Sequence, residues 1–218
     1  PHLLGRHSVL AAQLVACCVG TATVVVTGFV GRAIASARTG LIAAAGTAVY
    51  AGVWVYEQRV LSETLLFLGI AVLLLAAYDY LRHPGPARAA LLGALCGLLT
   101  LTRAEQVLLI PLLLVPLILG WRWRGITRAR LASLAVAVLV AAAVIAPWIG
   151  YNLQRFDQPV YLSDESGIVL AQGNCSTVYS GRLLGYIDIN CLRELGHDAA
   201  QRGSKTPLAD TTLRDEAL

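Results

Sequence analysis

The 218-residue chain is 57% hydrophobic and 14% charged, and its formal net charge is +4 at pH 7. This composition excludes a soluble globular domain and a disordered chain, and it indicates an integral membrane protein. Nucleic acid is not expected as a partner, because the arginines of residues 1–150 stand between apolar runs instead of forming a basic face with aromatic side chains.

Apolar runs dominate the first two thirds of the chain. The candidate membrane spans are residues 9–34, 40–56, 61–81, 89–102, 106–120 and 131–150. The predicted fold class is therefore an all-α polytopic membrane helix bundle of about six spans over residues 1–150. Residues 151–218 turn polar, and we expect a mixed extracytoplasmic segment there.

The short loops between these runs alternate in arginine content. The first, third and fifth loops hold eight arginines, which are Arg32, Arg38, Arg82, Arg88, Arg122, Arg124, Arg128 and Arg130. The second and fourth hold only Arg59 and Arg103. Because cytoplasmic loops are enriched in arginine, the rich loops are predicted to face the cytoplasm of a multi-pass protein in the bacterial plasma membrane. Glu63, Arg103, Glu105 and residues 151–218 then lie on the outer side.

Arg103 and Glu105 fall between two short apolar runs. As a helix, residues 89–102 would rise only about 21 Å against roughly 30 Å of hydrocarbon, so we expect a hairpin of two short helices with recessed charges at its tip. Charges at this depth often mark a functional site. A purely structural explanation also fits, because acids are favoured at helix starts and arginine at helix ends.

The outer charges suit phosphate chemistry. Arginine is a permanently charged fork that matches phosphate oxygens. A neighbouring carboxylate can hold a divalent cation, orient a hydroxyl group or tether the arginine, and the sequence leaves these options open; no cofactor is certain. The chain has no Ser-His-Asp set, phosphate-cradling glycine loop or paired zinc-ligand histidines, which argues against hydrolases and nucleotide-driven pumps.

The polar segment carries two further predictions. Residues 159–162 and 167–170 are expected as short strands, and residues 208–218 begin a helical pattern. Cys175 and Cys191 are expected to form a disulfide in the oxidising outer compartment, which would stabilise the segment by about 3 kcal/mol. Two free thiols are the alternative; zinc would need more ligands than these cysteines and His197 supply.

Several short motifs together resemble a known family. Leu-Ser-Glu-Thr-Leu at 61–65 and Leu-Thr-Arg-Ala-Glu at 101–105 are followed by Ala-Pro-Trp at 146–148, and then by Asn152, Arg155 and Phe156. In this order they resemble the GT-C class of integral membrane glycosyltransferases. The nearest branch contains the bacterial proteins like dolichyl-phosphate-mannose-protein mannosyltransferases and aminoarabinose transferases. The resemblance covers roughly residues 8–195.

The resemblance implies an inverting transfer of sugar from a polyprenyl-phosphate donor at the outer membrane face. Glu63 would be a cavity acid, Arg103 would contact the donor phosphate, and Glu105 would orient Arg103. Three more residues, Arg59, Asn152 and Arg155, would line the cavity rim. The family's principal catalytic aspartate would precede Pro1, so the resemblance implies a fragment, truncated at both ends, that does not transfer sugar alone.

Two other functional classes fit a bundle with a polar outer cavity. One is a transporter or flippase component, although the sequence shows no internal repeat and no mid-span charge apart from the Arg103 hairpin. The other is a non-catalytic membrane scaffold.

Overall fold

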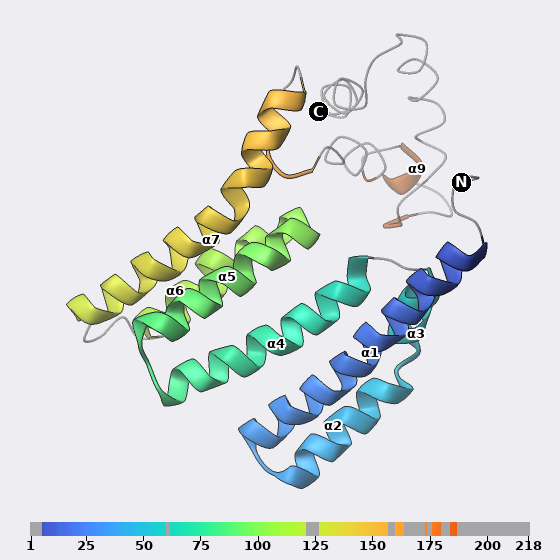
Figure 1. Ribbon diagram of the computed structural model, residues 1–218, viewed down its shortest axis with the longest axis horizontal. Coiled ribbons are helices and arrows are strands. Elements are labelled where there is room, and N and C mark those ends of the chain that lie inside the picture. Colours follow the sequence, from blue (N-terminus) through green and yellow to red (C-terminus); the bar gives the residue numbers. More distant parts are fainter. Residues whose placement is uncertain are drawn as a thin grey trace. The chain divides into compact units, whose positions relative to one another are not determined.

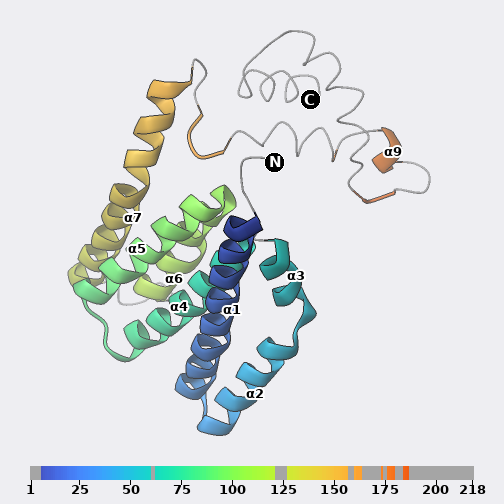
Figure 2. The same cartoon turned by 45° about the vertical axis from the view of Figure 1, so that its right-hand side comes forward.

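The computed structural model describes residues 6–59, 62–120, 127–156, 160–163, 173, 176–179 and 184–186. Every regular element in these ranges is a helix (Figures 1 and 2). The elements are α1 (Arg6–Ile34), α2 (Ala37–Val49), α3 (Ala51–Arg59), α4 (Ser62–Arg82), α5 (Pro86–Thr102), the 3₁₀ helix η1 (Ala104–Leu108), the π-helix η2 (Ile110–Leu114), α6 (Val115–Leu119), α7 (Arg128–Arg155) and α9 (Ser176–Tyr179). Two compact units divide the chain, Pro1–Ala146 and Pro147–Leu218.

Among the described residues, three helices are long and apolar enough to cross a membrane: Leu10–Ile34, Ser62–Arg82 and Arg128–Arg155. Two shorter apolar stretches, Pro86–Thr102 and Ala104–Leu119, accompany them. Large apolar side chains such as Leu14, Leu41 and Leu139 are about 70% exposed, as lipid-facing side chains of a membrane bundle are (67%, 72% and 67%). The prediction of an all-helical membrane protein is confirmed at this level.

The expected single helix over residues 40–56 is wrong in detail, because the structure divides it into α2 and α3. Tyr50 between them is extended, with φ −73° and ψ 110°. Its ring lies over Gly52, where an added Cβ would come within 2.5 Å of Tyr50 Cε1. Trp54 Nε1 also donates a hydrogen bond to the carbonyl of Ala48 at 3.0 Å. Side chains folding back on the backbone therefore end α2 inside an apolar run.

The core of the first unit lies between α4, α5, the η2–α6 segment and the first part of α7. Its buried members are Leu66, Leu73, Ala77, Tyr80, Ala89, Leu92, Cys96, Leu99, Leu114, Ile118 and Ala137. Gly93 lets α5 approach α7 closely, since an added Cβ would lie only 2.0 Å from the carbonyl oxygen of Ala137. Small residues allow this approach where lipid provides no hydrophobic drive for helix association.

The apolar run predicted over residues 106–120 is an interrupted helix. After the turn at Arg103 the chain forms η1, η2 and α6. This helical segment ends at Gly120, which has a φ of 90°. Pro111 and Pro116 explain the interruption, because each lacks the N–H group that would continue an α-helical ladder. The predicted hairpin of two short apolar helices is present, with Leu92 of α5 and Leu114 of η2 in the same core.

The described parts of the second unit contain helices and turns. Residues 160–163, which include most of the first predicted strand, form a bend, and Trp148 Nε1 donates to the carbonyl of Leu162 at 3.3 Å. The predicted strand at 167–170, the helical pattern at 208–218 and the predicted Cys175–Cys191 disulfide lie outside the described residues.

Thiol labelling of the purified protein should separate the cysteines of the first unit. Cys17 and Cys18 are exposed free thiols, whereas Cys96 is free and fully buried at the α4–α5–α7 contact. N-ethylmaleimide, which enters detergent, should modify Cys17 and Cys18 at least tenfold faster than Cys96 until the protein is heated, because only Cys96 is enclosed by neighbouring helices. Peptide mass spectrometry of timed samples measures this, and equal rates at Cys17 and Cys96 would contradict the packing of α5.

Candidate functional site

Glu63 stands in the first turn of α4, where an acid is favoured by the positive end of the helix dipole. Its side chain is largely buried, with 22% exposed. The neighbouring Ser62 hydroxyl donates to Glu63 Oε2 at 3.4 Å. One oxygen of the carboxylate, Oε1, remains directed to a partner on another helix.

That partner is Arg103, which terminates α5. Its backbone is extended, with φ −148° and ψ 125°, and its N–H donates to the carbonyl of Leu99 at 3.0 Å as the helix ends. The extended backbone turns the side chain away from the axis of α5. Arg103 Nη1 thereby reaches Glu63 Oε1 at 2.7 Å, a contact between residues 40 positions apart.

Glu105, the second residue of η1, holds the other edge of the guanidinium. Arg103 Nε and Nη2 both lie close to Glu105 Oε1, at 2.9 Å and 2.8 Å. The pKa of Glu105 is lowered chiefly by the hydrogen bond from its own backbone N–H; burial opposes this, and the hydrogen bond and charge of Arg103 add to the lowering. Glu105 is therefore a carboxylate at neutral pH.

We call Glu63, Arg103 and Glu105 the acid–arginine cluster. Arg103 donates two hydrogen bonds to the two carboxylates, and its Nη2 also lies in ionic contact with Glu105; among the described residues, N–H groups on both Nη atoms keep no hydrogen-bond partner and can serve a ligand. The Arg103 side chain is 38% exposed and that of Glu105 55%, which leaves the cluster accessible from outside. A guanidinium held in place by two carboxylates, with N–H groups left over, can bind an anionic group.

The other predicted site residues belong to α3 and α7. Arg59 is the last residue of α3, and its side chain lies outside the described part. In the second unit, Asn152 is buried and Arg155 is exposed. Arg155 Nη1 donates to the Tyr151 hydroxyl at 2.9 Å, and its guanidinium also lies over the rings of Tyr151 and Phe156.

One polar residue beside the cluster was not predicted. Thr64, next to Glu63, is 4% exposed, and its hydroxyl oxygen has no hydrogen-bond partner among the described residues. An unpaired buried hydroxyl is uncommon and usually has a reason. The only sequence feature that could have drawn attention to Thr64 is its position next to Glu63. Threonines in apolar helices are too common for this to predict a functional residue.

The described residues contain no group of three or more His, Cys, Asp or Glu side chains arranged to hold a metal ion. Comparison of the chain with protein-family models, with curated proteins and with solved structures finds no match. The acid–arginine cluster itself is therefore the basis for a functional assignment.

Proposed function

We propose that the chain belongs to a membrane glycosyltransferase that moves a sugar from a polyprenyl-phosphate donor to an acceptor at the outer face of the bacterial plasma membrane. The acid–arginine cluster binds the donor phosphate. The observation that supports this most directly is that Glu63 and Glu105 both contact Arg103, which fixes the guanidinium and, among the described residues, leaves N–H groups on both Nη atoms without a hydrogen-bond partner.

The charge balance of the cluster favours a particular kind of phosphate. Two carboxylates and one guanidinium give a formal charge of −1, which opposes binding of a dianion. A polyprenyl-phosphate sugar is a phosphodiester with one negative charge, so the repulsion is smaller. When the bond between the sugar anomeric carbon and the phosphate oxygen breaks, the departing phosphate gains a second charge, and the free N–H groups of Arg103 stabilise it at that moment.

Each residue of the cluster has a distinct part in this proposal. Arg103 contacts the phosphate, Glu105 positions Arg103 through its two contacts, and Glu63 is the acid lining the cavity. Arg59, Asn152 and Arg155 form the rim. A divalent cation bridging the phosphate and a carboxylate would relieve the same repulsion, and adding magnesium or a chelator to a binding assay tests for it.

The membrane arrangement is part of the proposal. The three long helices, together with the α2–α3 pair, α5 and the η1–η2–α6 segment, make six crossings. The start of α4 and the end of α5 then face outward with the cluster, and Arg82 and Arg88 at their other ends face the cytoplasm. Residues 151–218 and any Cys175–Cys191 disulfide are extracytoplasmic.

Binding of a polyprenyl phosphate to the purified 218-residue chain tests the function directly. Arg103→Ala should weaken binding at least tenfold, because a charge-assisted bidentate contact is worth about 1.5–3 kcal/mol. Arg103→Lys should recover only part of the affinity, since lysine lacks the planar fork. Microscale thermophoresis in detergent measures the Kd.

Arg38→Ala is the matched control for this experiment. Arg38 is an exposed arginine near the start of α2 and should bind as the unchanged protein does. Equal affinity of the Arg103→Ala variant and this control would refute the phosphate site.

A transporter or flippase remains the second candidate, and the interrupted η1–η2–α6 helix is the feature that favours it. Broken helices beside a charged residue are typical of transporter binding sites. Proteoliposomes loaded with a lipid-linked sugar discriminate the two: movement of the lipid between leaflets that depends on Arg103 would favour the carrier. Polyprenyl-phosphate binding unaffected by any cluster substitution would instead favour a scaffold.

A further inference from the structure

A cavity of about 480 Å³ lies at the C-terminal end of α4, where the α4–α5 turn meets the start of α7; Glu63 is at the other end of α4. The turn contributes Pro84, Gly85 and Pro86, and α7 contributes its first residues. Since α4 has 21 residues, this cavity is about 30 Å from Glu63 along the helix and is separate from the acid–arginine cluster.

Two buried hydroxyl groups belong to the lining of this cavity. Tyr80 of α4 is 3% exposed and Ser133 of α7 is 7% exposed. Within the described part of the chain neither hydroxyl makes a hydrogen bond, although neither is sealed from the cavity space. Because buried tyrosine and serine hydroxyls are normally paired, these two groups indicate a bound polar group.

The same wall carries positive charge. Arg130 lines the cavity, and its Nη1 donates to the carbonyl of Leu119 at 3.1 Å, which holds the side chain in place; its other N–H groups have no partner in the part of the chain that the structure describes. The Thr127 hydroxyl accepts from the Arg130 backbone N–H at 3.3 Å, as a helix-capping side chain does. The first turn of α7 adds unpaired backbone N–H groups and the positive end of the helix dipole. None of the described residues that line the cavity is acidic.

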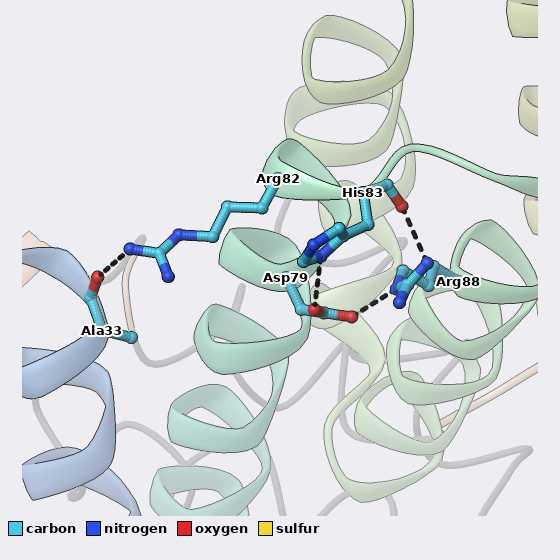
Figure 3. A network of polar contacts seen from close by, with 5 residues as sticks. All are labelled: Ala33, Asp79, Arg82, His83 and Arg88. Atoms are coloured by element: carbon cyan, nitrogen blue, oxygen red, sulfur yellow. Dashed lines mark hydrogen bonds and ion pairs between the residues drawn. The ribbon is translucent and has the colours of Figure 1, made fainter.

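A polar network fixes the turn that forms the opposite wall (Figure 3). Arg88 donates from Nε to Asp79 Oδ2 and from Nη1 to the His83 carbonyl at 3.1 Å. His83 Nδ1 lies 3.2 Å from Asp79 Oδ1. Both contacts of Arg88 cross the turn, so Pro84, Gly85 and Pro86 are held in place before any ligand binds.

We propose that this cavity binds a phosphate group, with Arg130, the Tyr80 and Ser133 hydroxyls and the start of α7 as its donors. The proline and alanine side chains of the lining suit the glycerol and upper acyl carbons of a lipid, so an anionic phospholipid of the arginine-rich face is the expected source. Soluble phosphate presents the same oxygens, and the experiment separates the two sources.

The purified chain is placed in nanodiscs of phosphatidylcholine with or without 20 mol% phosphatidylglycerol, and co-purifying lipid is counted by native mass spectrometry after release into detergent. The unchanged protein should retain phosphatidylglycerol in preference to phosphatidylcholine. Arg130→Gln should lower that retention about tenfold, and the double substitution Tyr80→Phe with Ser133→Ala severalfold. A parallel titration with inorganic phosphate in detergent identifies a soluble source if it stabilises the protein in an Arg130-dependent way.

Arg38→Gln is the control, because it removes an equal charge outside the cavity. Arg130→Lys distinguishes a binding defect from a folding defect. It keeps the positive charge, so it should retain more lipid than Arg130→Gln when both variants have the helicity and elution volume of the unchanged protein. Retention that does not distinguish the two lipids, together with no Arg130-dependent effect of phosphate, overturns the proposal. So does an equal loss in the Arg38→Gln and Arg130→Gln proteins.

Discussion

Replacing Gly93 by leucine should destabilise the first unit by about 3 kcal/mol or more, and even alanine should cost a large part of this. An added Cβ would lie 2.0 Å from the Ala137 carbonyl oxygen and 2.8 Å from its carbonyl carbon, so α5 and α7 must move apart. The clashing atoms belong to the backbone of Ala137 and cannot rotate away as a side chain could. The substitution should therefore be among the most destabilising of overpacking changes. The separation would also expose Leu92 and Cys96, which are fully buried between these helices.

Gly46→Ala is the matched control for the Gly93 substitutions. Gly46 also lies inside a helix, but nothing stands within 4 Å of an added Cβ. Alanine there should stabilise the protein by about 0.5–1 kcal/mol through helix propensity. Thermal unfolding in detergent, followed by tryptophan fluorescence, should show a lower Tm for Gly93→Ala and an unchanged or higher Tm for Gly46→Ala. A Tm for Gly93→Ala equal to that of the unchanged protein would refute the close contact of α5 with α7.

Reversing the charge of Glu63 should have the second largest effect. In Glu63→Arg the contact of 2.7 Å between Glu63 and Arg103 is replaced by two like charges, one at a largely buried position and one on the partly exposed Arg103. At an effective dielectric constant of about 20 this loss and the new repulsion should destabilise the protein by roughly 2 kcal/mol after allowance for solvent screening. Binding of a polyprenyl phosphate should also fall at least tenfold, because the guanidinium loses its fixed position.

The double substitution Glu63→Arg with Arg103→Glu distinguishes the ion pair from general damage. It restores opposite charges between α4 and α5, so it should recover at least half of the lost stability. Phosphate binding should stay weak, because the arginine is no longer beside Glu105. Additive losses in the double variant would show that the two side chains do not interact in the membrane protein.

The sequence predicted well those features that depend on long runs of one kind of residue. The helices α1, α4 and α7 follow the apolar runs 9–34, 61–81 and 131–150, extended at some ends by polar residues that hydropathy excludes. Arginine asymmetry and helix length also predicted that Glu63, Arg103 and Glu105 would gather at one end of the bundle, and ionic contacts do join them. Their roles in phosphate binding stay predictions.

Features that depend on a single tertiary or side-chain contact were not predictable. The break at Tyr50 arises because its ring folds over Gly52, and no periodicity reveals that contact. The π-helix before Pro116 depends on how η2 packs against α5, although the two prolines signalled an irregular helix. The hydroxyls of Tyr80 and Ser133 belong to helices far apart in the sequence, so their meeting at one cavity required the fold.

The α4–α5 hairpin carries an ion pair near each of its ends, Glu63 with Arg103 and Asp79 with Arg88. Sliding one helix along the other by a single residue, about 1.5 Å, would strain both pairs together. When the protein enters a thinner or thicker bilayer, the hairpin should therefore adapt by tilting as a body. The depth of Arg103 in the bilayer would then vary with membrane thickness while its distance from the α4–α5 turn stays constant.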